Sequence, residues 1–350
     1  MVGLRTGKTA RVLPILAAAA GLGVVSLGLA APQMAAASPQ TITLYNGQHL
    51  QTTNALVEAF EKKTGITVLV RTDDEDVLAD QIVAEGKRSP ADVFFTENSP
   101  ALEFLQSKGL LARIDRSTLP ETQARYDSPS DRWVGISARV SVLIYNPSIV
   151  PASQLPTSVL QLANKKWNGK LAIAAGETDF QPIVTSVIRT DGEAAALKWL
   201  EGLKANAGSH VYPDNETITS MVNSGQAGIG IINQYYWYRE QAAVGKKNMH
   251  SKIAYFAPHD PGYVINVSGA AVLASSHHQA AAQRFVAFMA SRAGQQIISH
   301  SDSFEYPIDS GVTTAEPETP FNQLQPNSIS IADLGDGAAA IALLQKVQLL

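Results

Sequence analysis

Two adjacent tyrosines, Tyr235 and Tyr236, could place two phenol oxygens at one point. They follow the apolar residues Ile231 and Ile232, which predict the end of a buried strand. Phenolate is a rare biological ligand, and a hard, highly charged cation such as Fe(III) favours it most. If both hydroxyls bound one metal ion, the chain would handle ferric iron.

Adjacent tyrosines also have an ordinary structural interpretation. In a regular strand, neighbouring side chains point to opposite faces, so such a pair more often belongs to the core and its boundary. Tyr235 and Tyr236 can converge only if they lie beyond the strand end, where the backbone bends toward a helix. We expect that bend at Asn233 and Gln234.

The composition limits the class of protein. With 350 residues, the chain is long for one domain and sufficient for two with sizeable cores. The formal net charge is −4. The sequence therefore gives no sign of a basic surface that would bind nucleic acid. Cysteine is absent, which excludes disulfides, thiolate metal sites, a cysteine nucleophile and a cysteine for lipid attachment.

Residues 1–37 have the three parts of a secretory signal. These parts are three positive residues, an apolar stretch over 12–31 and three alanines at 35–37. Cleavage after Ala37 would take the formal charge from −4 to about −7. The alternative is an uncleaved anchor, because about twenty uncharged residues can span a bilayer. In either case we expect an exported protein, periplasmic or extracytoplasmic at the cell surface.

Strand-like and helix-like segments alternate along the chain, which predicts α/β layers with mainly parallel strands. The expected strands cover residues 41–45, 66–70, 91–95 and 139–145. The expected helices cover residues 52–63, 192–204 and 338–349. Two further helices are expected to begin at N-caps, one at Ser99 before Pro100 and one at Asn215.

Polar residues stand where several of the expected strands end. Open α/β sheets bind ligands at the carboxyl ends of their strands. The residues at these ends are His49, Glu97, the stretch 177–179, Asn233 and the tyrosine pair. They come from widely separated parts of the chain, as a cleft between two lobes requires. Arg139, in an expected strand, could pair with a site carboxylate or form a structural salt bridge.

Several segments together resemble the periplasmic ferric-ion-binding proteins, which are the receptors of ABC iron importers. The segments are residues 45–49 (YNGQH), 88–94 (RSPADVF), 192–200 (GEAAALKWL), 233–237 (NQYYW) and 268–273 (SGAAVL). Their order and spacing are specific, and the likeness covers residues 41 to about 307.

The resemblance implies an α/β, two-lobed periplasmic-binding-protein (Venus flytrap) fold with two inter-lobe crossings. The crossings are expected near Ser141 and Val267. The first lobe would comprise residues 41–141 and about 267–315. The second lobe would comprise residues 142–266 and about 316–350.

The resemblance also implies a ligand set. In the family, ferric ion is held by a histidine, a glutamate and two adjacent tyrosines, which match His49, Glu97, Tyr235 and Tyr236. One carboxylate and two phenolates cancel the three charges of Fe(III) if the histidine is neutral. Because tyrosine ordinarily titrates near pH 10, binding should release two protons per ion.

A small synergistic anion completes the coordination in the family. Carbonate, or phosphate with water, could fill the two remaining positions of an octahedron. The family's anion donors match a loop that contains Thr178 and Asp179, together with Asn215 and Asn233. This loop also carries Glu177, where relatives often have small neutral residues.

Two interpretations of this acidic loop are open. The carboxylates of Glu177 and Asp179 could point away while Thr178 and backbone N–H groups bind the anion. Alternatively, one carboxylate, with Glu177 as a possible extra ligand, could coordinate iron and replace the anion.

These observations predict a receptor that is not an enzyme. It would capture Fe(III) outside the cytoplasm as a monomer and deliver it to an ABC permease and its ATPase. One alternative is the same fold binding an organic cation such as a polyamine or thiamine, with Tyr235, Tyr236 and Trp237 as an aromatic cage and Glu97 as counter-charge. His49 argues against this cage, which has no use for it. The other alternative is a secreted metalloenzyme, which would need an open coordination position and a placed acid or base.

Overall fold

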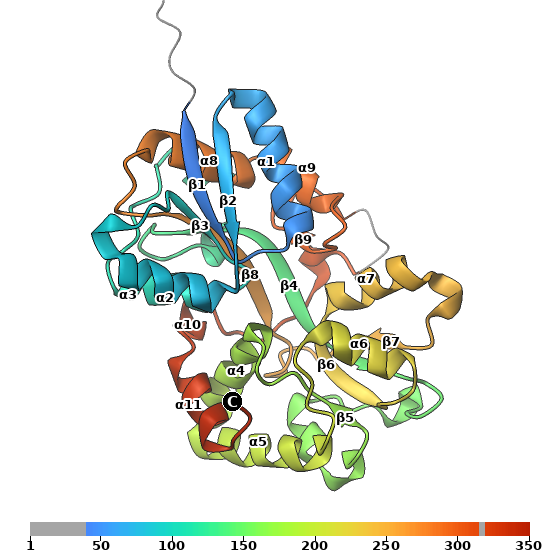
Figure 1. Ribbon diagram of the computed structural model, residues 1–350. Helices are drawn as coiled ribbons and strands as arrows, with labels where there is room; N and C mark the ends of the chain where they lie inside the picture. The colour runs from blue at the N-terminus through green and yellow to red at the C-terminus, as the bar shows by residue number, and fades with distance from the viewer. Residues whose placement is uncertain (1–39, 315–318) are drawn as a thin grey trace, which may run out of the picture. The chain divides into compact units, whose positions relative to one another are not determined.

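The computed structural model describes residues 40–314 and 319–350, so the predicted signal lies outside the described residues. The strands are β1 (Thr41–Asn46), β2 (Thr67–Thr72), β3 (Val93–Phe95), β4 (Val134–Tyr145), β5 (Leu171–Ala172), β6 (Ile229–Asn233), β7 (Lys252–Ala254), β8 (Ile265–Val272) and β9 (Tyr306–Pro307). Seven of them follow the order β2-β1-β3-β8-β4-β6-β5, and β7 and β9 both pair with β4 (Figure 1).

Helices lie between and after these strands. The α-helices are α1 (Leu50–Thr64), α2 (Glu75–Glu85), α3 (Pro100–Ser107), α4 (Gln181–Asp191), α5 (Glu193–Ala207), α6 (Asn215–Asn223), α7 (Gln234–Val244), α8 (Gln279–Ala290), α9 (Arg292–Ser299), α10 (Ile331–Leu334) and α11 (Ala338–Lys346). Within the described parts of the chain, none of them has the length and apolar character of a membrane span.

Strand β4 changes partners along its length and joins two parts of the sheet (Figure 1). Residues 134–140 pair with β8, whereas residues 141–145 pair with β6. We call β1, β2, β3, β8, β9 and residues 134–140 the N-sheet, and β5, β6, β7 and residues 141–145 the C-sheet. The change of partner falls at Ser141, near one expected crossing, and the lobe boundaries themselves stay a prediction.

The expectation of mainly parallel strands is wrong. Parallel pairs join β1 to β2 and β3, and β5 to β6. The β3–β8 pair and all four pairings of β4 are antiparallel. The reason is topological, because β4 runs from the N-sheet into the C-sheet while β8 returns in the opposite direction.

Helices cover both faces of the N-sheet. In β3, the side chains of Val93 and Phe95 pack in one buried cluster with Phe285 of α8. Phe94 points the other way and packs in a second cluster with Leu102 of α3. A strand that is buried on both faces has a continuous apolar sequence, and this pattern predicts a strand over residues 91–95, which includes β3.

The expected N-cap at Asn215 is wrong by one residue. Asp214 has an extended backbone (φ −149°, ψ 166°), and its side chain accepts a hydrogen bond from Thr217 N at 2.7 Å. Asn215 is the first residue of α6. Ser99 does precede α3 as expected, but its hydroxyl donates to Asn266 Oδ1 at 3.1 Å instead of capping the helix.

Asp127, which lies beside the N-sheet, is a buried carboxylate with an unusual pKa. Its Oδ1 accepts a hydrogen bond from Gly135 N at 2.9 Å. Burial raises the pKa of Asp127 to about 6, so the folded protein holds this proton more tightly than the unfolded chain. The resulting stability is complete below about pH 4 and is lost as the pH rises through about 6.

We expect Asp127→Asn to reduce this loss, because asparagine keeps the acceptor for Gly135 N and cannot ionise. The fall in the free energy of unfolding between about pH 4 and pH 7 should become smaller by about 2–3 kcal/mol. Urea denaturation at both pH values measures the difference. An equal fall in the variant and the wild type would contradict the assignment.

Candidate metal centre

Tyr235 and Tyr236 lie in the first turn of α7, directly after β6. Asn233 is the extended N-cap residue (φ −84°, ψ 149°), and the helix begins at Gln234. Successive helical residues are rotated by roughly 100°, not 180°, so both tyrosine side chains can reach one place. Their ring centroids are 4.1 Å apart and both residues are buried. The bend expected at Asn233 and Gln234 is confirmed.

His49 and Glu97 reach the tyrosines from two loops of the N-sheet. His49 follows β1 and Glu97 follows β3, and these two strands are parallel neighbours. Their carboxyl ends therefore meet at one edge of the sheet. His49 Nε2 lies 3.1 Å from Glu97 Oε1, and the Tyr235 hydroxyl donates a hydrogen bond to that same oxygen. The structure thus brings together all four residues that were expected to bind metal.

The acidic loop before α4 also contacts the tyrosines. Asp179 Oδ2 accepts hydrogen bonds from the hydroxyls of Tyr235 at 3.2 Å and Tyr236 at 3.0 Å. Glu177 Oε1 accepts a longer one from Tyr236 at 3.3 Å. Neither carboxylate points away from the tyrosine pair.

Of the remaining expected anion donors, Asn215 and Asn233 lie beside the acidic loop, whereas Thr178 is bonded elsewhere. Asn215, at the start of α6, donates from its backbone N to Glu177 Oε2 at 2.9 Å and from Nδ2 to Asp179 Oδ2 at 3.3 Å. Asn233 lines a small cavity with Asp179 and Asn215. Thr178 Oγ1 instead accepts a hydrogen bond from Asn98 Nδ2 at 3.1 Å. The N–H groups at the start of α6 therefore donate hydrogen bonds to the protein's own carboxylates.

Burial and crowding shift the titration of these groups toward their protonated forms. Burial, with the charge of Asp179, raises the pKa of Glu177 to about 10. Burial, with the charge of Glu97, raises the pKa of Asp179 to about 6. The pKa values of both tyrosines lie well above the usual range, first because of burial and then because of Asp179. A cation at this place would relieve the mutual repulsion.

Glu97 and His49 behave differently, because they face each other. Burial favours the neutral form of Glu97, but His49 and Arg139 lower the pKa of this carboxyl well below its usual range. Burial also opposes the charging of His49, but Glu97 raises the pKa of its imidazole. Glu97 is thus the acid of the cluster whose pKa is lowered, and its environment favours the carboxylate form.

In the described part of the chain, His49 and Glu97 are not part of a larger group of conventional metal ligands. Within residues 40–314 and 319–350, no three His, Cys, Asp or Glu side chains are grouped so that they could hold a metal ion. The tyrosine oxygens beside His49 and Glu97 are therefore the candidate further ligands at this place.

Sequence reasoning missed Glu75, which holds the Glu97 loop. Glu75 Oε2 accepts hydrogen bonds from the backbone N of Glu97 at 2.7 Å and of Asn98 at 2.8 Å. A Cβ atom on Gly47 would lie 2.6 Å from Glu75 Cβ, so this close approach requires a glycine. The glycine in the turn after the first strand was the only signal in the sequence.

Arg239 was also missed. Its Nη1 lies 3.4 Å from His49 Nε2 and 3.3 Å from Glu216 Oε1. It follows Tyr235 and Tyr236 by four and three residues in α7, and helical spacing could have placed it on their face. Trp237 lies in the same helix, but its Nε1 donates to Ser251 O at 3.3 Å.

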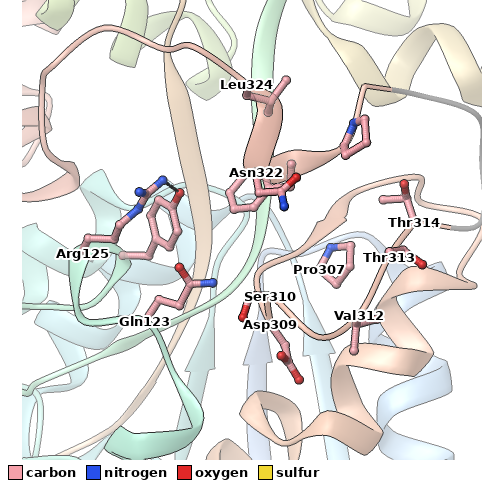
Figure 2. Close-up of a pocket in the computed structure, with 13 residues that line it drawn as sticks. Gln123, Arg125, Pro307, Asp309, Ser310, Val312, Thr313, Thr314, Asn322 and Leu324 are labelled. Atoms are coloured by element: carbon pink, nitrogen blue, oxygen red, sulfur yellow. Dashed lines mark hydrogen bonds between the residues drawn. The ribbon is translucent and has the colours of Figure 1, made fainter.

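A separate cavity of about 340 Å³ lies near β9 (Figure 2). Charged and polar side chains on its wall include Gln123, Arg125, Asp309 and Asn322. None of the site residues expected from the sequence lines this cavity. The candidate metal centre is therefore defined by its side chains and not by a large open space.

Comparisons with known proteins give a consistent result. Residues 46–296 match the family model described as bacterial extracellular solute-binding protein. The chain is 38% identical over 309 residues to the Fe(3+)-binding periplasmic protein of Serratia marcescens, and the alignment covers 88% of this chain and 91% of that protein.

Two solved structures are similar over nearly the whole described chain. Iron-bound HitA from Pseudomonas aeruginosa has a TM-score of 0.84 and 41% identity, covering 88% of this chain and 99% of that one. A Trichodesmium protein in complex with iron and citrate has a TM-score of 0.77 and 30% identity, with 88% and 99% covered.

The role of Glu75 can be tested on the protein alone. We expect Glu75→Ala to release the Glu97 loop, because it removes the acceptor of two backbone N–H groups. Amide hydrogen exchange at Glu97 and Asn98 should then be at least about tenfold faster. Amides of α8, which lies on the other face of the N-sheet, should exchange as in the wild type. Unchanged protection at both loop amides would show that Glu75 does not hold the loop.

Proposed function

This chain belongs to the family of bacterial extracellular solute-binding proteins, and we propose that it is a ferric-ion receptor. The observation that carries the proposal is the convergence of His49, Glu97, Tyr235 and Tyr236 at one buried place. One imidazole and three oxygen donors suit a hard cation such as Fe(III). Relatives named for ferric iron support this assignment.

Hydrogen bonds from the phenols join the residues that would bind the metal. The Tyr235 hydroxyl donates to Glu97, and both tyrosine hydroxyls donate to Asp179. A ferric ion replaces these protons, because a bound cation strongly lowers the pKa of its ligands. The two tyrosines bind as phenolates, so each ion releases two protons and acid drives iron off.

Asp179 supplies the carboxylate that carbonate or phosphate would otherwise provide. Its Oδ2 is already within hydrogen-bond distance of both tyrosine hydroxyls, and Asn215 Nδ2 orients it from behind. Glu177 is the weaker candidate for an extra ligand, because Asn215 N holds its Oε2. An external anion would meet the Asp179 carboxylate at this place, and its charge would repel the anion.

The ligands come from both parts of the sheet, so iron links them. His49 and Glu97 belong to N-sheet loops, whereas Asp179 and the tyrosine pair follow C-sheet strands. We place these parts in two lobes, 41–141 with 267–315 and 142–266 with 316–350. Binding then favours the closed arrangement of the lobes. The receptor acts outside the cytoplasm as a monomer, catalyses no reaction, and delivers iron to an ABC permease and its ATPase.

Neither alternative function has a supporting observation. An aromatic cage for an organic cation would need Trp237 beside the tyrosines, but its Nε1 donates to Ser251 O. Asp179 also takes the hydrogen bonds of both tyrosine hydroxyls. A metalloenzyme is not favoured, because the matched family is one of solute-binding proteins.

The phenolate ligands can be tested by colour. We expect the wild type to develop a visible phenolate-to-iron charge-transfer band when ferric salt is added. Tyr235→Phe should remove most of the band and weaken binding by at least about tenfold. Tyr212→Phe, a change in a tyrosine that stacks on His210, serves as the matched control and should leave the band intact. A colourless wild type would contradict the proposed function.

The proposal that Asp179 replaces the external anion can be tested by varying the buffer anion. We expect the wild type to bind ferric ion equally well with and without added carbonate or phosphate. Asp179→Ala should bind at least about tenfold more weakly in anion-free buffer and should recover when either anion is added. Glu177→Ala should lose less. A wild type that needs an added anion would exclude Asp179 as the replacement.

A further inference from the structure

Arg139 and Glu305 form a buried ion pair directly behind the candidate metal centre. Arg139 lies in β4 and Glu305 directly precedes β9, and neither side chain is exposed. Arg139 Nη2 pairs with Glu305 Oε1 and lies 3.9 Å from Glu97 Oε1. The guanidinium carbon lies 5.5 Å from the ring centre of Tyr235. One guanidinium group thus lies within 4 Å of two carboxylates, Glu305 and Glu97, and Glu97 is a proposed iron ligand.

Two polar atoms of this pair are unpaired. Arg139 Nε and Glu305 Oε2 are both buried, and neither has a hydrogen-bond partner among the described residues. They are the second donor and the second acceptor that a two-bond arginine–carboxylate pair would join. Arg139 and Glu305 are therefore joined through Nη2 and Oε1 but not through Nε and Oε2. The guanidinium group also faces Glu97.

Glu305 is connected to the segments that carry the proposed ligands. Gln48 Nε2 lies 3.3 Å from Glu305 Oε1, and Gln48 Oε1 accepts the hydrogen bond of His49 N at 2.7 Å. The preceding residue, Phe304, has a strained positive φ of 59°. Its carbonyl oxygen accepts a hydrogen bond from Gln234 Nε2 at 3.3 Å, next to the tyrosine pair.

We propose that Glu305 is a positioning residue for the metal centre, which holds the charge of Arg139 away from Glu97 when iron binds. This inference rests on the proposed function. Iron and Arg139 compete for the same carboxylate. When Glu97 turns to the metal, Arg139 is released and completes its pair with Glu305 through Nε and Oε2. The Arg139–Glu305 pair is then neutral and adds no net charge behind the iron site.

The test is Glu305→Gln, alone and together with Arg139→Gln, in full-length protein titrated with ferric salt. Without the Glu305 charge, Glu97 is the carboxylate left within 4 Å of Arg139, besides the neutral Asn98 amide. We expect the single variant to bind iron about 10- to 100-fold more weakly. Its charge-transfer band should move to shorter wavelength, because an unbalanced cation near Tyr235 stabilises the phenolate electrons. Removing Arg139 as well should return the band to its wild-type wavelength and bring the affinity for ferric ion to within about threefold of the wild type.

Asp127→Asn is the matched control, because it removes a buried carboxylate outside the metal centre, and it should change neither affinity nor band. Wild-type affinity in a folded Glu305→Gln protein would overturn the inference. So would a double variant as weak as the single one, because the effect would then not pass through Arg139. If the single variant does not fold, the double variant decides: affinity near wild type supports the inference, and a loss above about tenfold overturns it.

The failure of this inference is distinguishable from failure of the proposed function. A wild type without a charge-transfer band contradicts the function itself. A normal wild-type band with unchanged binding in Glu305→Gln contradicts only the role of Glu305.

Discussion

The candidate metal centre depends on one constraint: several acids share a buried place where they cannot all be ionised. Asp179, Glu177 and both tyrosine hydroxyls have raised pKa values, mainly because burial disfavours their charged forms. Shared protons therefore hold the cluster together, through hydrogen bonds from the tyrosines to Glu97 and Asp179. A small trivalent cation can do the same by replacing them. The arrangement thus suits an ion that is captured and later released by a change in protonation.

The fold supplies what this constraint needs, which is accurate placement of side chains from distant segments. The tyrosines converge because α7 begins immediately after β6. Glu97 is placed because Glu75 accepts the backbone N–H groups of its loop. On the other side of Glu97, the buried Arg139 balances its charge and is itself balanced by Glu305. Glu97 is therefore backed by two buried partners, Glu75 and Arg139, and such partners commonly set metal affinity.

Much of this could be predicted from the sequence. The family resemblance and the α/β periplasmic-binding-protein fold are confirmed by the matches to the family and to iron-bound HitA. Local signals sufficed for the bend at Asn233, since an apolar strand followed by polar residues marks a strand end. The four expected metal residues do come together, and their binding of iron stays a proposal.

The rest depended on contacts that sequence patterns do not encode. Glu75 and Glu305 act on residues far away in the chain, and nothing local distinguishes them from surface acids. The direction of β4 was missed for the same reason, because alternating elements do not show which way a strand passes between two parts of a sheet. At Asn215, two neighbouring residues were both good caps, and only the backbone angles select Asp214.

The most direct measurement is a crystal structure of the protein loaded with ferric ion in buffer without carbonate or phosphate, with anomalous data collected at the iron edge. The account predicts one iron peak within bonding distance of both tyrosine oxygens, Glu97 and His49, with Asp179 as a further oxygen ligand. An iron peak at any other place, or one that leaves either tyrosine oxygen unbound, would contradict it.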